Sequence, residues 1–148
     1  MKRRNNAAQL FCLLSVLLIF GLVSSCKKKE PDASNYIEAI TSFANQQNKK
    51  CPVIINKSTQ LESVTFGENT LTYRYTVSDE VITTVNVNDS NTRKSIIGDL
   101  SEQLKEYMVK GNCKLKYLYV SQHDSSYLEI IPAELENSLL TNKQEKDR

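Results

Sequence analysis

The segment "TQLESVTFGENTLTYRYTV", residues 59–77, decides the fold that the sequence predicts. Apolar, β-branched and tyrosine side chains dominate it on both sides of the polar trio Gly67, Glu68 and Asn69. Two such runs separated by a short glycine-containing stretch are typical of a β-hairpin. We therefore expect two antiparallel strands that are joined by a turn at these three residues.

A second hairpin is predicted nearer the end of the chain. The segment "CKLKYLYVSQHDSSYLEIIP", residues 113–132, carries two apolar runs on either side of the polar stretch "QHDSS" at 122–126. Two shorter segments also indicate strands. The apolar stretch "CPVIIN" at 51–56 reads as extended after Pro52, and "VITTVNV" at 81–87 has the β-branched alternation of a third strand.

Two amphipathic helices are predicted around these strands. The first spans residues 34–50, and the second spans residues 88–111, with Asp89 or Ser90 as its N-cap and Gly111 as its C-terminal stop. The apolar side chains of the second helix follow the spacing of one buried face: Ile96, Ile97, Leu100, Leu104, Tyr107 and Met108.

Hairpins and amphipathic helices together predict an α+β domain. The expected order is αββ(β)αββ, with one antiparallel sheet of two hairpins, four or five strands in all, and two helices packed on one face. A short last helix starts at Pro132. The domain is expected to span residues 35–140, and the polar stretch at 141–148 is predicted to be a disordered tail.

Three parts of this domain share a pattern with known proteins. They are "CPVIINKSTQLESVTF" at 51–66, "LTYRYTV" at 71–77 and the tyrosine-rich stretch from Gly111 to Tyr119. Together they resemble a group of small exported bacterial proteins of unassigned function, over roughly residues 36–132. The resemblance implies a small exported α+β domain, and it brings no catalytic signature with it.

The N-terminal segment predicts export. Lys2, Arg3 and Arg4 precede the apolar run "LFCLLSVLLIFGLV" at 10–23. A run of this length extends about 21 Å as a helix. A helix that spans the hydrocarbon core of a membrane must extend about 30 Å, which requires about 20 residues. The run therefore suits the hydrophobic region of an export signal better than a transmembrane helix.

The tetrad "VSSC" at 23–26 closes this run. It resembles the lipobox of bacterial lipoproteins, which implies that residues 1–25 are removed as a signal peptide. It further implies that Cys26 receives a diacylglyceryl group, a firm membrane anchor because two acyl chains hold stably. Residues 26–34 would then form the lipidated tether. The alternative is an uncleaved signal anchor.

The stretch "KKKEPD" at 27–32 and the composition rich in Asn, Lys and Tyr are similar to lipoproteins of the Bacteroidota. The implied location is the cell envelope, with the lipid in the outer membrane and the domain facing the periplasm. In that group an acidic segment after the cysteine can mark export to the cell surface. Only Glu30 and Asp32 are acidic here, so surface exposure stays an alternative.

Charge and composition narrow the classes of partner. The full chain has a net charge of +2, but without Lys2, Arg3 and Arg4 the 19 basic side chains fall to 16 against 17 acidic ones. Because a nucleic-acid-binding protein requires a retained basic patch, we expect no nucleic-acid partner. One histidine and widely spaced cysteines do not match a zinc site, so we expect no metal and no cofactor.

Two cysteines remain after Cys12 leaves with the signal and Cys26 is lipidated. Cys51 and Cys113 form a candidate disulfide, since disulfides persist outside the cytosol. The bridge would close a loop of about 60 residues and stabilise the fold by about 4 kcal/mol. The alternative is a pair of free thiols that behave as small hydrophobic side chains.

The tyrosines are the candidate binding surface. Tyr73 and Tyr75 share one face of a strand, and so do Tyr117 and Tyr119. If the two hairpins are neighbours, four rings stand on one side of the sheet. Under covering helices the rings would belong to the core. On an open face they would form an aromatic surface for a glycan, a peptide or a protein.

The turn "SQHDSS" at 121–126 contains the residue types of a hydrolytic triad, with His123 as the only histidine. Neighbouring side chains on a hairpin tip usually point into water and do not converge, so we interpret this turn as polar surface. The sequence therefore favours a non-enzymatic, membrane-anchored envelope lipoprotein that binds or scaffolds an unidentified protein or glycan. The alternatives are an inhibitor or immunity-type protein acting on an envelope enzyme or toxin, and a small envelope hydrolase that uses His123.

Overall fold

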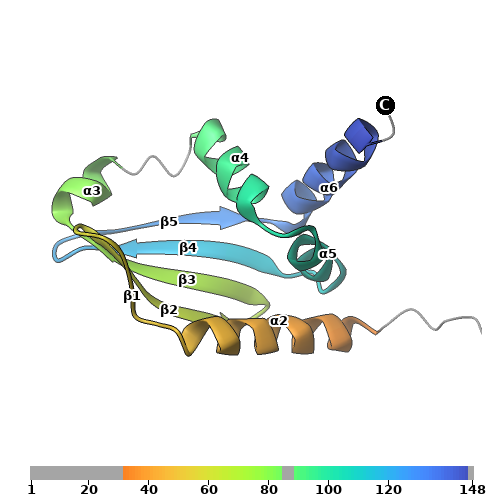
Figure 1. Ribbon diagram of the computed structural model, residues 1–148, viewed down its shortest axis with the longest axis horizontal. Helices are drawn as coiled ribbons and strands as arrows, with labels where there is room; N and C mark the ends of the chain where they lie inside the picture. The colour runs from red at the N-terminus through yellow and green to blue at the C-terminus, as the bar shows by residue number, and fades with distance from the viewer. Residues whose placement is uncertain (1–31, 85–88, 147–148) are drawn as a thin grey trace, which may run out of the picture. The chain divides into compact units, whose positions relative to one another are not determined.

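The computed structural model describes residues 32–84 and 89–146 of the chain (Figure 1). The predicted signal segment, Cys26 and most of the predicted tether lie outside these residues. None of the helices in the described ranges is both long enough and apolar enough to span a membrane.

A five-stranded sheet is the centre of the fold, and its spatial order β1-β2-β3-β4-β5 is also the order of the strands in the sequence. The strands are β1 (Val53–Asn56), β2 (Thr59–Gly67), β3 (Thr70–Val77), β4 (Lys114–Val120) and β5 (Ser125–Ile130). The α+β class and both predicted hairpins are confirmed. The sheet is mixed rather than antiparallel throughout, because β3 and β4 pair in parallel.

The parallel pair follows from the long connection between β3 and β4. A short turn can only reverse the chain, whereas a parallel pair requires a crossover of about a dozen residues or more, usually with a helix. Residues 78–113 supply this crossover and contain the helices α3 (Asp79–Thr84), α4 (Ser90–Asp99) and α5 (Glu102–Lys110).

The turn of the first hairpin consists of Glu68 and Asn69, which have φ angles of 50° and 54°. Two successive residues with positive φ form the turn whose twist matches a β-hairpin, and asparagine tolerates this conformation well. The carbonyl of Asn69 also accepts a hydrogen bond from the Lys114 amide at 2.8 Å. This bond aligns the start of β4 with the start of β3.

The strand predicted at 81–87 is wrong in its described part. Residues 81–84 belong to α3, and residues 85–87 lie outside the described ranges. Ser78 begins this helix, since both its hydroxyl and its carbonyl accept hydrogen bonds from the Val81 amide. A local cap of this kind outweighs the β propensity of the β-branched residues that follow, since that propensity spans only about 1 kcal/mol and depends on context.

The single helix predicted at 88–111 is two helices. Leu100 has an extended conformation, with φ −74° and ψ 137°, and ends α4. The hydroxyl of Ser101 then accepts the Leu104 amide at 3.3 Å and begins α5. Asp89 is the N-cap of α4, and it is one of the two N-caps, Asp89 or Ser90, that the sequence predicted.

Two helices flank this region in the sequence. α2 (Ala33–Asn48) precedes the sheet, and α6 (Pro132–Lys146) follows it. α6 begins at Pro132 as predicted but continues to Lys146, into the stretch at 141–148 that the sequence predicted as a tail.

The helices pack on one face of the sheet (Figure 1). α2 packs against β2 and α5, and α5 packs against α6. The Asn48 side chain at the end of α2 accepts the Val64 amide at 3.0 Å, which fixes this helix to β2. The core combines buried side chains of the helices and the sheet: Ile40, Ala44, Val64, Leu71, Leu104, Met108, Cys113, Leu115, Leu128, Ile130 and Leu135.

Candidate functional site

The side of the sheet that faces the helices is buried at one end and open further along its strands. Paired residues on neighbouring strands lie side by side on one face, so the register defines rows across the sheet. The first row contains Phe66, Leu71, Leu115 and Ile130. The last three of these have no exposed surface, and Phe66 is partly buried, so this end of the sheet is covered.

The next two rows are progressively less covered. The middle row contains Val64, Tyr73, Tyr117 and Leu128, and the third row contains Val53, Leu61, Tyr75, Tyr119 and Ser126. Val64 and Leu128 are buried, but no member of the third row is. Beyond that row, Val77 and Ile82 of the α3 end are buried again. The third row is therefore a partly exposed strip between two buried regions.

Four tyrosines stand side by side in these two rows, and we call them the tyrosine stack: Tyr73, Tyr117, Tyr75 and Tyr119. The ring centroids are 5.2 Å apart for Tyr73 and Tyr117, 6.2 Å for Tyr117 and Tyr75, and 5.4 Å for Tyr75 and Tyr119. The ring planes lie within 19° of parallel. In-register pairing of β3 with β4 produces this stack, because strands lie about 4.8 Å apart.

The stack spans the boundary between core and surface. Tyr73 and Tyr117 pack against the buried core, whereas Tyr75 and Tyr119 lie outside that cluster. The structure thus brings the four predicted tyrosines together. Tyr73 and Tyr117 lie at the core under the helices, and Tyr75 and Tyr119 lie on the partly open face, so both alternatives from the sequence apply.

The hydroxyls of the stack face solvent. Within the described part of the chain none of the four has a hydrogen-bond partner, and none is buried without one. A phenol in this position is accessible and free to bond to a ligand. It can both donate and accept a hydrogen bond as long as it stays protonated.

Partial burial makes these phenols harder to ionise than an ordinary tyrosine, whose pKa of about 10 already leaves it protonated at physiological pH. Loss of solvent contact raises the pKa of Tyr73 and of Tyr75 to about 12, and it also raises the pKa of Tyr117 and of Tyr119. At Tyr75 and Tyr117 the neighbouring phenols contribute to this rise in pKa, because adjacent phenolates would repel each other. All four hydroxyls are therefore neutral at physiological pH.

The stacking limits what a ligand can meet. Each ring has one face towards a tyrosine of the paired strand, and the other sides of Tyr75 and Tyr117 are next to Leu61 and Leu128 in their rows, so ring edges and hydroxyls are presented outward. Aromatic edges carry partial positive charge and favour contact with carbonyl oxygens or with the faces of other rings. This surface suits polypeptide better than a sugar that requires a free aromatic face.

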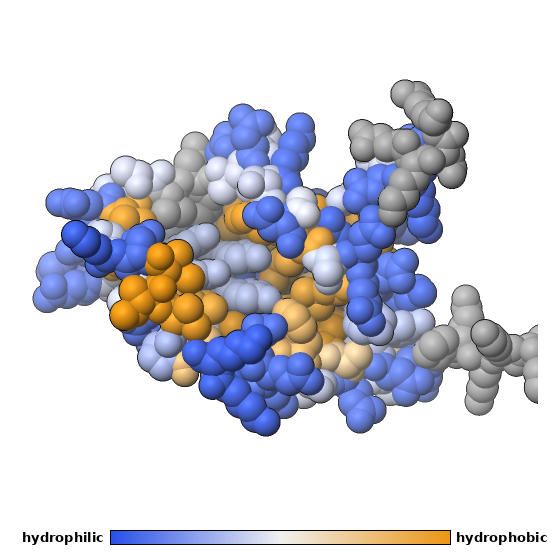
Figure 2. Space-filling model, in the orientation of Figure 1, coloured by the Kyte–Doolittle hydropathy of each residue, from blue (hydrophilic) through white to orange (hydrophobic). Residues whose placement is uncertain are grey.

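The third row continues onto β1 at Val53, which is 37% exposed. Ile54 and Ile55 of the same strand are 76% and 56% exposed, and Ile54, the neighbour of Val53, lies on the opposite face of the sheet. Figure 2 shows strongly hydrophobic side chains beside side chains of intermediate hydropathy on the helix-facing side of the sheet. The binding surface therefore extends from the tyrosine stack towards the edge strand.

Sequence reasoning identified β1 as extended but missed its exposure. A usable signal was present. The apolar run is short and lies between Lys49 and Lys50 on one side and Lys57 on the other. Lysines around a short strand are typical of a sheet edge.

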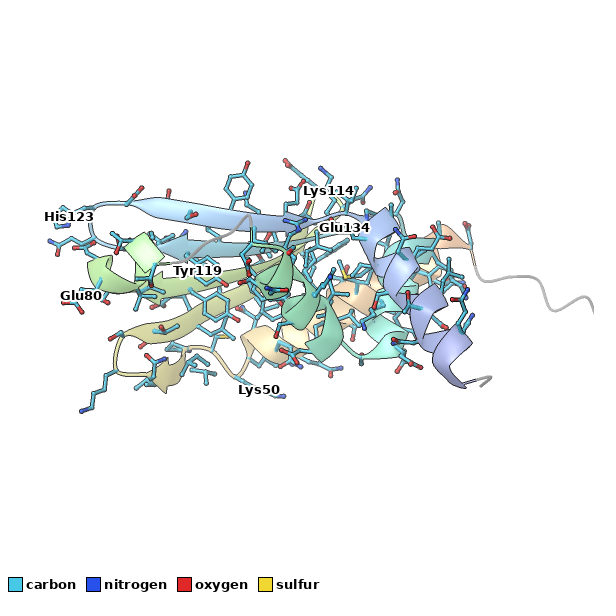
Figure 3. The ribbon with its side chains drawn as sticks, turned by 90° about the horizontal axis from the view of Figure 1, so that it is seen from above. Lys50, Glu80, Lys114, Tyr119, His123 and Glu134 are labelled. Carbon is cyan, nitrogen blue, oxygen red and sulfur yellow. The ribbon has the colours of Figure 1, made fainter. Side chains whose placement is uncertain are left out.

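The opposite side of β4 is polar. Lys114 Nζ lies 3.1 Å from Glu129 Oε1, and Lys116 Nζ lies 4.5 Å from the centroid of the Tyr127 ring. Figure 3 shows Lys114 pointing away from the helices and Tyr119 pointing towards them. The two sides of β4 therefore have different roles, one solvated and one in the candidate site.

The candidate disulfide is not formed, and Cys51 and Cys113 are free thiols. Each one has its own backbone partner. Cys51 Sγ donates to the Gln47 carbonyl at 3.6 Å, and Cys113 Sγ donates to the Gly111 carbonyl at 3.2 Å. Burial raises the pKa of the Cys113 thiol, which makes it a poor nucleophile.

His123 has a partner that the sequence did not reveal. Its Nδ1 lies 2.8 Å from Asp79 Oδ2 at the start of α3, and the side chains are 72% and 49% exposed. The nearby Ser121 hydroxyl and the His123 side chain lower the pKa of the Asp79 carboxyl. The Ser121 hydroxyl donates to the Asp124 carbonyl at 3.3 Å, not to the imidazole. The pair therefore joins α3 to the second hairpin turn without the serine arrangement of a triad.

A metal could be held only by carboxylate, histidine or cysteine side chains that converge. In the ranges 32–84 and 89–146 no group of three such side chains does so.

Comparisons with solved structures show where this fold occurs. A protein of Pseudomonas aeruginosa described as secreted aligns over 70% of this chain and 95% of its own, with 12% identity and a TM-score of 0.56. A pilotin from the type 2 secretion system of Vibrio vulnificus aligns over 70% of this chain and 94% of its own, with 6% identity and a TM-score of 0.49. The Pseudomonas protein shares the fold.

A search of curated proteins gives no match. A family model does match, over residues 34–128, and that range includes both hairpins down to Leu128 and all four tyrosines of the stack. Since this range is more than half of the chain, the protein belongs to the family described as a domain of unknown function, DUF8479.

Proposed function

We propose that this protein is a lipid-anchored protein of the cell envelope that acts by binding or scaffolding and not by catalysis. One observation carries the binding role: the tyrosine stack lies where the helices stop covering the sheet. Tyr75 and Tyr119 are held rigidly by stacking, yet they remain partly exposed with free hydroxyls.

Rigid, partly exposed tyrosines suit a binding surface. They bury much apolar area on contact and lose little conformational freedom, and for this reason tyrosine is enriched at protein interfaces. The stack already fixes the ring orientations, so a partner would bind a preorganised surface. We infer a protein partner, because ring edges and hydroxyls are what the stack presents.

The anchor rests on the sequence. The lipobox-like tetrad at 23–26 supports lipidation of Cys26, and the short tether would hold the domain near the outer membrane on its periplasmic side. The fold is compatible with export, since a protein described as secreted shares it.

Substitution of Cys26 tests the anchor. We expect the wild-type chain in the membrane fraction, with mass spectrometry showing residues 1–25 removed and an acylated Cys26. Cys26→Ala should lose the acyl group and should no longer be processed before residue 26. An unmodified Cys26 on a chain that retains its first 25 residues would exclude the lipoprotein role.

Site-specific photo-crosslinking tests the binding surface. A photoreactive amino acid at Tyr119 should crosslink to one specific envelope protein, while the same amino acid at Thr72 on the opposite face should not. Tyr75→Ser with Tyr119→Ser should abolish capture of that protein, and Tyr127→Ser, at a 56% exposed ring on the other face, should leave it intact. His123→Ala should also keep it. Equal crosslinking from both faces would rule out the stack as the site.

A further inference from the structure

The β1 strand has a free edge. It is the first strand of the sheet, and among residues 32–84 and 89–146 it pairs only with β2, so one row of its backbone N–H and C=O groups has no strand partner in those ranges. Such an edge is a template for a further strand. The apolar side chains on it are exposed, with Ile54 at 76% and Ile55 at 56%.

The surroundings of β1 are positively charged. Lys49 and Lys50 precede the strand, Lys57 follows it, and all three are exposed. The nearest carboxylate in the sequence, that of Glu62 on β2, accepts a hydrogen bond from Gln60 at 2.9 Å. A segment that lies along β1 would therefore meet apolar side chains in its middle and ammonium groups at both ends.

The register connects this edge to the tyrosine stack. Val53 pairs with Leu61, Leu61 pairs with Tyr75, and Tyr75 pairs with Tyr119. A residue of an added strand that paired with Val53 would extend this row on the tyrosine side. Its neighbours along the added strand would point to the opposite face, where Ile54 lies.

We propose that β1 binds an extended segment of a partner protein as a sixth strand of the sheet, and that this segment has an alternating apolar centre with acidic residues at its ends. The inference rests on the proposed function, because it names the chemistry of the partner at the same surface. Main-chain hydrogen bonds would supply affinity, and alternate side chains beside Val53 and Ile54 would supply specificity.

A lipid surface fits this site less well. Lysines and exposed isoleucines also favour contact with an anionic membrane, but the unpaired backbone groups of a sheet edge cannot enter hydrocarbon without a large cost. An added strand satisfies those groups.

Peptide selection tests the inference. The probe is a displayed library of random nine-residue peptides, selected on the folded protein at low salt. We expect enriched peptides with β-branched residues at alternate positions, acidic residues near the ends and no central proline. An enriched peptide should also slow hydrogen exchange of the β1 amides. Enrichment of helical spacing or of basic residues, or a failure to enrich any sequence, would overturn the inference.

Charge reversal supplies a second measurement that does not depend on a change in the core. Lys50→Glu with Lys57→Glu should weaken binding of the enriched peptide by about tenfold or more, since these charges steer and hold an acidic segment. Lys94→Glu with Lys143→Glu on α4 and α6, both exposed, is the matched control and should change binding by less than about twofold.

The outcomes separate this inference from the proposed function. If Tyr75→Ser with Tyr119→Ser abolishes capture of the crosslinked partner while the β1 lysine reversals and Ile54→Glu leave its capture unchanged, the binding surface stands and strand addition is wrong. Binding to anionic phospholipid vesicles through Ile54 and Ile55, with no peptide enriched, would also overturn strand addition. Loss of capture in both sets of variants supports it.

Discussion

At the scale of single residues, Tyr73 and Tyr75 differ although only Arg74 separates them. Tyr73 packs against the core, and Tyr75 lies in the partly exposed third row. Loss of solvent contact nevertheless raises the pKa of both phenols to about 12, from an ordinary value of about 10. Two phenols that are expensive to ionise therefore lie at the candidate site.

This shift predicts a loss of stability in alkali. Between pH 10 and about 12 the folded chain keeps protons that the unfolded chain releases, so the free energy of unfolding falls as pH rises. The contribution is complete below pH 10 and is lost as pH passes through about 12. Urea unfolding at a series of pH values measures it.

Single phenol removals provide the comparison for this measurement. Tyr75→Phe should flatten the alkaline decline, because one raised phenol is gone. Tyr127→Phe, at an exposed ring on the opposite face, should leave the decline as in the wild type. The same pH profile for both variants would contradict the assignment to the stack.

Arg93 is a second residue with a defined role. Its guanidinium contacts both carboxylate oxygens of Glu134 at 2.7–3.1 Å and donates to the Glu129 carbonyl at 2.7 Å, so it joins α4 to α6 and β5. Arg93→Ala should lower the free energy of unfolding by about 1–2 kcal/mol. Arg93→Lys should restore only part of this, because an ammonium lacks the planar fork. Lys94→Ala, exposed on the same helix, should change stability by less than about 0.5 kcal/mol.

At the scale of elements, the break between α4 and α5 depends on a cap. The Ser101 hydroxyl accepts the Leu104 amide, and the preceding Leu100 is extended. The apolar spacing continues across the break, so the pattern alone indicated one helix. The spacing of apolar side chains does not reveal that a single residue, Leu100, is extended between the two helices.

Removal of this cap should be measurable. Ser101→Ala should cost about 1 kcal/mol in the free energy of unfolding, which is typical for loss of an N-cap. Ser95→Ala, at an exposed position inside α4, is the control and should be neutral or slightly stabilising because alanine favours helix. Thermal and urea unfolding of both variants provide the comparison. Equal effects at the two serines would show that Ser101 is not a cap.

At the scale of the whole molecule, the sheet has one face covered by helices and one face in solvent, and β4 contributes side chains to both. Leu115 lies in the first row and has no exposed surface, whereas Leu118 is partly exposed on the other face. Leu115→Ala should cost about 2–5 kcal/mol, as expected for a cavity in a closely packed core. Leu118→Ala should cost clearly less, and similar losses at both positions would show that the burial of the two faces is misassigned.

The sequence by itself determined the parts of this protein that depend on neighbouring residues. Both hairpins could be predicted, because turn residues such as Asn69 and strand residues lie next to each other in the chain. The cap at Asp89 and the start of α6 at Pro132 could be predicted for the same reason. The lipobox-like tetrad at 23–26 is likewise a local motif, and it carries the proposed anchor.

Only the tertiary structure decided how these parts meet. The crossover at 78–113 makes β3 and β4 parallel neighbours, and this pairing stacks the four tyrosines. The lengths and packing of the helices leave the third row partly exposed and put β1 at a free edge. Such contacts join residues that are distant in the sequence, so local spacing permits them without specifying them.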